Sequence, residues 1–242
     1  GESDAATLRK LDQELAQLSL QFGEHVLAET NKFVHFVDQM SELEGLPQGA
    51  LEAAAQLAAE KGQEGQWAFT LDYPSYIPVM TYAQSRDLRK TLFMAFNTKC
   101  AKGDALDNQE IVRQLVTLKQ QRAKLLGYES HAHFTLEERM AKSPETVFEF
   151  LNSLLEKAKP KAALDVQEVA ALAKKLDQLE VLEKWDFAYY SELLKKEKYA
   201  LDEEELRPYF SLENVISGVF ATASRLFGLS FVANSEIQVY HP

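Results

Sequence analysis

The sequence has few of the residues that interrupt helices. Only ten glycines and seven prolines occur in 242 residues, fewer than the roughly 12% that an average domain carries. This scarcity predicts long helices. The single cysteine, Cys100, excludes an internal disulfide bond and leaves the compartment open between cytoplasm and periplasm. No apolar run approaches the roughly 18 residues that a membrane-spanning helix needs, so a membrane protein is not expected.

Positive charge is also scarce. The sequence carries 26 Lys and Arg against 37 Asp and Glu, a formal net charge of −11. Such a balance repels a phosphate backbone, so nucleic acid is not expected as a partner. Apolar residues make up 46% of the chain, which fits one globular unit or two small ones.

Both ends of the sequence favour an internal piece of a longer protein. Residues 1–4 lack an initiator methionine and do not resemble a signal peptide, and residues 239–242 stop within an extended-looking run. We therefore interpret residues 1–242 as a single helical region of a larger protein. Residues 229–242 are expected to begin a small sheet that continues beyond the last residue.

The N-terminal residues predict one long amphipathic helix. Apolar side chains recur at steps of three and four from Ala5 to Met40, interrupted only by Gly23. A helix of this length spans roughly 50 Å and must pack against several others. A turn at residues 45–47 should end it, and an alanine-rich helix follows from Pro47 to Lys61.

The middle of the chain contains short extended segments and several helix-start signals. Trp67–Leu71 is typical of a strand, and Asp72–Pro78 is expected to be a rigid aromatic connector. A helix or helix pair should follow, with Ser85 as an N-cap. Further starts are predicted where a capping side chain precedes a helical pattern. These are Asp107 with Glu110 in a capping box, Ser130, and Ser143-Pro144-Glu145.

From Ser143 to residue 227 the apolar pattern is mainly helical. Pro160 should kink or divide the helix that runs to about Leu182. The later helices are expected at 185–198, 202–210 and 211–227, and the last strands at 229–232 and 237–240. The predicted fold class is mainly α, with a long N-terminal helix, nine or ten helices in all, and two or three short β-strands.

The histidines do not predict a metal site. His25 and Glu29 would share a helix face, but two ligands do not make a site, and a surface hydrogen bond is the simpler interpretation. His131 and His133 would point in nearly opposite directions on a helix. His35 is expected to be partly buried, and His241 lies too near the last residue to interpret.

No catalytic residue is predicted in this chain. The sequence contains no His-Glu-x-x-His, Gly-x-Ser-x-Gly, phosphate-binding loop or dinucleotide fingerprint. Cys100 has no identifiable histidine partner. The carboxylates at 202–205 and 137–138 favour solvated helix starts rather than an acid–base pair.

Two aromatic groups remain. Trp185, Tyr189 and Tyr190, together with Tyr209 and Phe210, are interpreted mainly as core packing. Tyr73 and Tyr76 flank Pro74 after a predicted strand, where a phenol could line a cleft beside a strand edge able to pair with a peptide. Tyr73 and Tyr76 are therefore the candidate substrate-binding residues.

Five blocks in order resemble one family, that of the thimet oligopeptidases and peptidyl-dipeptidases. The resemblance covers nearly the whole chain and is more specific than any single motif. Its blocks are FTLDYPSYIPVMTYAQSRDLRKTLFMAF, DNQEIVRQLVTLKQQRAKLLGY, MAKSPETVFEFLNSLL, WDFAYYSELLKKEKYALDEEELRPYFSLENVISGVF, and LFGLSF with the later VYHP.

The resemblance implies a neurolysin-like helical lobe that encloses a channel for short unstructured peptides. In that family a zinc ion is held by a His-Glu-x-x-His helix and a downstream Glu, all beyond the block that ends this chain. The resemblance thus implies zinc and short peptide substrates for the intact enzyme, and no zinc, metal ligand or catalytic residue here. Whether the intact enzyme cuts internally or removes dipeptides is left open.

Two hypotheses follow from these residues. In the first, the chain is a non-catalytic helical part of a zinc oligopeptidase, which supplies channel wall and support. In the second, it is a helical scaffold or protein-binding module without enzymatic chemistry. In either case, apolar surface that normally packs on missing residues could drive self-association.

Overall fold

The computed structural model describes residues 1–200 and 203–240, and it is mainly helical as the sequence predicts. The chain divides into two compact units, Gly1–Leu194 and Lys195–Pro242, which are described separately. His241 and Asp202, which were considered above, lie outside the described residues.

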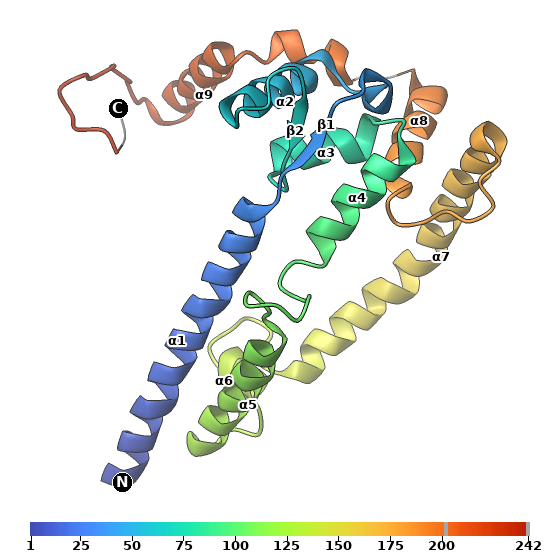
Figure 1. Ribbon diagram of the computed structural model, residues 1–242. Coiled ribbons are helices and arrows are strands. Elements are labelled where there is room, and N and C mark those ends of the chain that lie inside the picture. Colours follow the sequence, from blue (N-terminus) through green and yellow to red (C-terminus); the bar gives the residue numbers. More distant parts are fainter. Residues whose placement is uncertain (201–202, 241–242) are drawn as a thin grey trace. The chain divides into compact units, whose positions relative to one another are not determined.

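The elements are labelled in Figure 1. The α-helices are α1 (Glu2–Lys32), α2 (Gln48–Glu60), α3 (Tyr73–Tyr82), α4 (Arg86–Asn97), α5 (Gln109–Leu125), α6 (His131–Leu136), α7 (Pro144–Asp177), α8 (Phe187–Tyr199) and α9 (Leu212–Phe227). The strands are β1 (His35–Val37) and β2 (Trp67–Phe69), and short 3₁₀ segments lie at Met40–Leu43, Glu203–Glu205 and Arg207–Tyr209.

The first helix is shorter than its apolar pattern predicts. It ends at Lys32, and the backbone turns extended at Phe33. Residues 35–37, predicted as helix, instead form β1, which pairs antiparallel with β2 so that His35 lies opposite Phe69 and Val37 opposite Trp67. The prediction was wrong here because aromatic and β-branched residues at close spacing satisfy either period, and burial of Val37 favours the strand.

The predicted strand at Trp67 is confirmed, whereas the predicted connector after it is wrong. Residues 73–82 form α3, with Pro74 in the first turn, where a helix needs no N–H from that residue. Pro78 lies inside the helix and removes one hydrogen bond, that to the Pro74 carbonyl. Burial of Val79 and Met80 in the main core stabilises the helix despite this loss.

The main core of the first unit lies where the two strands, α2, α3 and α4 meet. Its buried side chains include Val37, Leu43, Phe69, Val79 and Leu92, each no more than 3% exposed. Trp67 and Trp185 pack against this core. They are the only two tryptophans in the sequence, so indole fluorescence reports on the first unit alone.

The serine N-caps are placed as predicted. Ser85 accepts a hydrogen bond from the Leu88 N–H (3.3 Å), and Ser130 and Ser143 accept equivalent bonds at α6 and α7. Ser211 does the same at α9. Each side-chain oxygen satisfies one N–H of the first helical turn, which has no partner within the helix.

The capping box predicted at Asp107 does not form. The N-cap of α5 is Asn108. Asp107 accepts hydrogen bonds from the backbone N–H of Gln109 (2.8 Å) and of Gly103 (2.6 Å), and these bonds lower the pKa of its carboxyl. The reciprocal bond is absent because the Asp107 N–H donates to the Asp104 carbonyl (3.1 Å) and the Glu110 carboxylate accepts from Arg113 and Gln114 instead.

The long helix α7 is not divided by Pro160, contrary to one of the two predicted outcomes. It ends at Asp177 rather than Leu182, where Gln178 adopts a left-handed conformation (φ 54°). Every residue from 148 to 164 is exposed. Only the C-terminal end of α7 is buried, through Val169, Leu172 and Ala173.

The second unit contains the 3₁₀ turns and α9. The predicted helix at 202–210 is replaced by these short turns. Tyr209 and Phe210 are largely exposed, so core packing was the wrong prediction for them. Residues 229–240 form no strand, although Phe231 stacks on Phe220 (4.4 Å between ring centroids). That residues 229–242 begin a sheet continued elsewhere stays a prediction.

Candidate functional site

The two candidate tyrosines lie on the first turns of α3 and share one aromatic neighbour. Tyr76 is buried and stacks on Phe96 of α4, with ring centroids 4.4 Å apart. Tyr73 is 68% exposed and meets the edge of the same ring at 6.1 Å. The Lys99 ammonium lies 4.0 Å from the Phe96 centroid. Because Tyr76 is buried, Tyr73 carries the more accessible phenol of the two, and burial also raises the pKa of Tyr76.

A cavity of about 210 Å³ lies beside β2, between α2 and the start of α3. Alanines 50, 53, 54 and 68, Leu57 and Phe69 line its apolar side, and Thr70, Asp72, Pro74 and Ser75 line its polar side. The Ser75 hydroxyl accepts from the Thr70 N–H at 3.0 Å. Neither candidate tyrosine lines this cavity, although the residues around Pro74 do.

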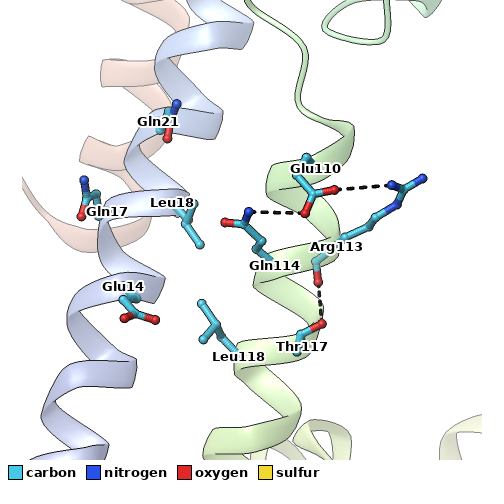
Figure 2. A pocket seen from close by; sticks show the side chains of 9 residues that line it. All are labelled: Glu14, Gln17, Leu18, Gln21, Glu110, Arg113, Gln114, Thr117 and Leu118. Atoms are coloured by element: carbon cyan, nitrogen blue, oxygen red, sulfur yellow. Dashed lines mark hydrogen bonds and ion pairs between the residues drawn. The ribbon is translucent and has the colours of Figure 1, made fainter. Parts of the chain in front are cut away.

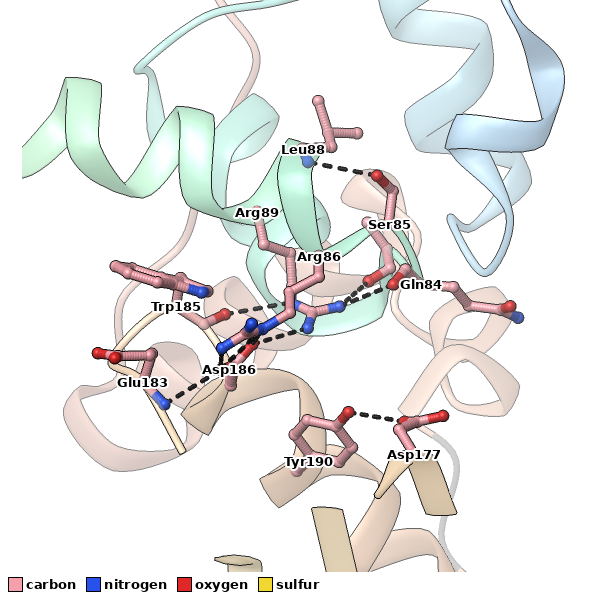
Figure 3. Close-up of polar contacts among 11 residues, drawn as sticks. Gln84, Ser85, Arg86, Leu88, Arg89, Asp177, Glu183, Trp185, Asp186 and Tyr190 are labelled. Atoms are coloured by element: carbon pink, nitrogen blue, oxygen red, sulfur yellow. Dashed lines mark hydrogen bonds and ion pairs between the residues drawn. The ribbon is translucent and has the colours of Figure 1, made fainter. Parts of the chain in front are cut away.

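The strongest polar cluster of the first unit joins the start of α4 to the start of α8 (Figure 3). The Asp186 carboxylate, 0% exposed, accepts hydrogen bonds from Arg86 (Nη2, 2.8 Å), Arg89 (Nη2, 3.1 Å) and the Glu183 backbone N–H (3.0 Å). Burial alone would raise the pKa of Asp186. The hydrogen bonds from Arg86, Glu183 and Arg89 outweigh burial, so the pKa is lowered.

The second arginine of this cluster is itself buried. Arg89, 1% exposed, donates to the carbonyls of Trp185 (3.1 Å), Ala83 (2.7 Å) and Gln84 (3.0 Å). Its guanidinium also lies 4.3 Å from the ring centroid of Tyr189. Because its charge faces Asp186 and its remaining donors face carbonyls, Arg89 fixes the α3–α4 turn against α8.

This cluster holds the predicted aromatic residues of the first unit in place. Trp185 and Tyr189 pack against the cores, and Tyr190 is 3% exposed and donates its hydroxyl to Asp177 (2.6 Å). Burial and this bond raise the pKa of Tyr190. Core packing is thus the correct interpretation for these three residues. The sequence analysis did not predict the buried pair of Arg89 and Asp186. The only local signal was the position of Asp186, next to Trp185 and just before a helix.

His25 and Glu29 of α1 each contact a residue of the loop that precedes α5. His25 Nδ1 lies 2.9 Å from Asn108 Oδ1, and the Asn108 amide donates to the Phe22 carbonyl (3.1 Å). The buried Glu29 pairs with Lys102. These contacts fasten the C-terminal half of α1 to the loop.

The other histidines and the cysteine occupy separate places. His131 and His133 lie on α6, where His133 Nδ1 is 2.8 Å from the Ser130 hydroxyl. Partial burial lowers the pKa of His131 and of His35. Cys100 is buried, which raises the pKa of its thiol. Within residues 1–200 and 203–240, no three metal-binding side chains converge, so these residues do not fit a zinc site.

No helix within the described ranges is both long and apolar enough to cross a membrane.

The sequence places the chain in a peptidase family. The sequence matches Peptidase family M3 over residues 79–242, more than half of the chain, and the protein therefore belongs to that family. The resemblance stated from the five sequence blocks is thus confirmed.

Individual relatives align with nearly the whole chain. Oligopeptidase A of Haemophilus influenzae is 37% identical over 231 residues, which cover 94% of this chain and 34% of that protein. Dipeptidyl carboxypeptidase of Escherichia coli is 34% identical over 242 residues, 100% of this chain and 36% of that protein. Saccharolysin of Saccharomyces cerevisiae is 28% identical over 244 residues, 98% and 33% respectively. The chain spans about a third of the length of these relatives.

Proposed function

We propose that this chain is a non-catalytic helical part of a zinc-dependent oligopeptidase or peptidyl-dipeptidase, in which it forms channel wall and support. The observation that carries the proposal is the alignment of almost the entire chain with only a third of each relative. The sequence also contains no His-Glu-x-x-His motif. In the longer protein, zinc would polarise the scissile carbonyl of a short peptide and activate water. None of that chemistry is assigned to residues of this chain.

The exposed middle of α7 supports a packing role. Between Phe148 and Leu155 its apolar residues recur at three- and four-residue steps, as on a helix that packs against another layer. These are Phe148, Phe150, Leu151, Leu154 and Leu155, and Leu164 lies further along the helix; each is at least 49% exposed. An apolar stripe of this length is costly in water, and the missing two thirds of such a peptidase would supply its cover.

The purified chain is expected to bind no stoichiometric zinc and to leave a quenched short peptide uncut. Metal analysis after gel filtration and a fluorescence hydrolysis assay test this, with the Escherichia coli dipeptidyl carboxypeptidase as positive control. Stoichiometric zinc together with chelator-sensitive turnover would contradict the proposal. Reading the gene beyond the codon for Pro242 should reveal a His-Glu-x-x-His sequence, and its absence would favour the scaffold hypothesis instead.

Self-association of the isolated chain belongs to the same proposal, because the α7 stripe has no cover within the described residues. Sedimentation velocity over a range of concentrations should show a growing fraction of dimers or larger species. A monomer at every concentration would contradict it.

We propose Tyr73 as the substrate contact, with the buried Tyr76 and the half-buried Phe96 packed beside it. In the full-length peptidase, Tyr73→Ala should raise KM for short peptides several-fold, because one exposed aromatic contact contributes about 0.5–1.5 kcal/mol. Tyr199→Ala is a suitable control, since Tyr199 is an equally exposed tyrosine in another element. Unchanged steady-state kinetics of Tyr73→Ala on several peptides would contradict the proposed substrate contact.

A further inference from the structure

One pair of long helices, α1 and α5, shows how this chain joins two helices side by side. They run antiparallel, since Arg122 near the end of α5 pairs with Asp12 (2.6 Å), whereas Asn108 at its start binds a main-chain carbonyl later in α1. Leu18 and Leu118 point toward each other from the two helices, beside a cavity of about 430 Å³ (Figure 2). Apolar side chains between the helices and opposite charges at the edge hold the pair together.

The middle of α7 offers similar groups without a neighbour. Every residue from 148 to 164 is exposed, so within residues 1–194 no helix of the first unit covers this part of α7. Apolar residues alternate at steps of three and four along one face and form a heptad seam, which comprises Phe148, Leu151, Leu155, Ala158 and Ala162. Its three large side chains are at least 51% exposed. In proteins, such a seam packs against the seam of a second helix.

The α7 seam is complementary in shape to a second copy of itself that runs in the opposite direction. With a two-fold axis at the middle of the seam, Phe148 of one copy lies opposite Ala158 of the other, and Leu151 opposite Leu155. Each large ring then faces a methyl group, which fills the space between the helices without a clash. A shift by one heptad in either direction loses this match, because Phe148 then lies opposite Leu151 or Asp165.

The charges beside the seam favour the same register. Glu145 and Lys159 occupy equivalent positions at one edge of the seam, so that Glu145 faces Lys159 of the second copy, and two-fold symmetry forms this pair twice. The Glu145 carboxylate lies 4.0 Å from His133 Nε2, but its side chain is 70% exposed and can be reached by a lysine of another molecule. In a parallel pair, Glu145 would instead lie beside Met140, which precedes the helix.

We infer that residues 145–162 of α7 are the contact between two copies of this chain, which pair as antiparallel helices with Phe148 opposite Ala158 and Glu145 opposite Lys159. This inference rests on the proposed function, which leaves the α7 stripe of this chain uncovered, and it specifies the partner and the geometry of the self-association. A second copy is favoured over an unrelated helix because shape and charge match in one register. Pro160 lies on the side of the helix opposite the seam, where it does not disturb the contact.

Charge reversal at the edge of the seam tests the register. Lys159→Glu should raise the dissociation constant of the dimer about tenfold in sedimentation equilibrium, because two attractive pairs become repulsive. Lys157→Glu is the matched control, since it changes the net charge equally on an exposed residue of the same helix that lies off the edge of the seam. It should leave the constant unchanged. Adding Glu145→Lys to Lys159→Glu exchanges the two charges and should restore the affinity, and circular dichroism verifies the helix content of each variant.

A distance measurement tests the direction of the two helices independently of charge. Spin labels are attached at Ser153→Cys or at Gln167→Cys, both on the side of α7 away from the seam. Labels at 153 should lie level with each other at the axis, whereas labels at 167 should be separated by about 42 Å along the helices. Electron–electron double resonance measures both distances. Cys100 is buried, and the unsubstituted chain after the same labelling treatment is the blank.

Four results would overturn the inference. These are a monomer at every concentration, equal effects of Lys159→Glu and Lys157→Glu, failure of the charge exchange to restore the affinity while the helix content is unchanged, and equal label distances at 153 and 167, which a parallel pair would give. Dimers that tolerate Lys159→Glu would place the contact on another surface. Zinc and turnover measurements test the proposed function separately, so a zinc-free, inactive chain with the wrong label distances removes this inference alone.

Discussion

Replacing Asp186 by alanine should lower the free energy of unfolding of the first unit by about 3–5 kcal/mol. The variant leaves the Arg89 guanidinium buried at 1% exposure without its counter-charge. Urea unfolding followed by tryptophan fluorescence measures the change, because both tryptophans pack against the core of the same unit.

Arg86→Ala provides the control for this variant. Arg86 contacts the same carboxylate, but its side chain is 43% exposed, and Asp186 keeps Arg89 as its partner. The loss should stay near about 1 kcal/mol, as for other solvent-accessible ion pairs. Equal destabilisation by the two substitutions would show that burial of Arg89 is not the source of the effect.

The Asp186 carboxylate also makes the unfolding free energy of the first unit depend on pH. The pKa of Asp186 is lower in the folded chain than in the unfolded chain, where it is about 3.9. Its contribution is therefore complete above that value and is lost as the pH falls through the lower, folded pKa. The difference in unfolding free energy between the native chain and Asp186→Ala should shrink below about pH 4.

Substitution of Gly45 by alanine is expected to cost about 3 kcal/mol or more. Gly45 has φ +89°, and an added Cβ would lie 2.2 Å from the backbone oxygen of Tyr82. Two penalties combine here, since the left-handed backbone disfavours a side chain and the neighbouring atom belongs to a main chain that cannot rotate away. The Gln84 N–H bond to the Glu44 carbonyl (2.9 Å) holds the two segments together.

Gly65→Ala separates these two penalties. Gly65 has a similar φ of +86°, but apart from its two neighbours in the chain no residue has an atom within 4 Å of the place that an alanine Cβ would occupy there. It should therefore cost only the conformational part, about 1 kcal/mol. A loss at Gly45 no larger than at Gly65, measured by the same unfolding experiment, would contradict the close contact.

Local signals in the sequence predicted the parts of the fold that depend on local chemistry. Ser85, Ser130 and Ser143 cap the helices that follow them, because the capping bond spans only three residues. The end of α1 was not predictable in this way. The apolar residues that were expected to continue it form a strand instead, paired with residues 30 to 34 positions further along the chain, and such pairing has no local signature.

At the candidate site, too, the sequence predicted local neighbours but not the contacts with distant segments. The sequence identified Tyr73 and Tyr76 as neighbours, but not that one is buried and the other exposed, which depends on Phe96 from α4. The pairing of Arg89 with Asp186 joins residues 97 positions apart. Likewise, the sequence did not show that Asn108, the N-cap of α5, is hydrogen-bonded to the Phe22 carbonyl of α1. In each case a partner from a distant segment decides the outcome.

The solvent-exposed middle of α7, residues 148–164, should exchange its amide hydrogens early. Residues 148–164 touch little else in this chain, so their helical hydrogen bonds open without breaking any tertiary packing. Pro160 lacks an N–H, which leaves the Glu156 carbonyl without its usual donor and weakens the helix at that turn. The amides on either side of Pro160 therefore exchange with solvent sooner than those of α4, whose inner face is packed into the core.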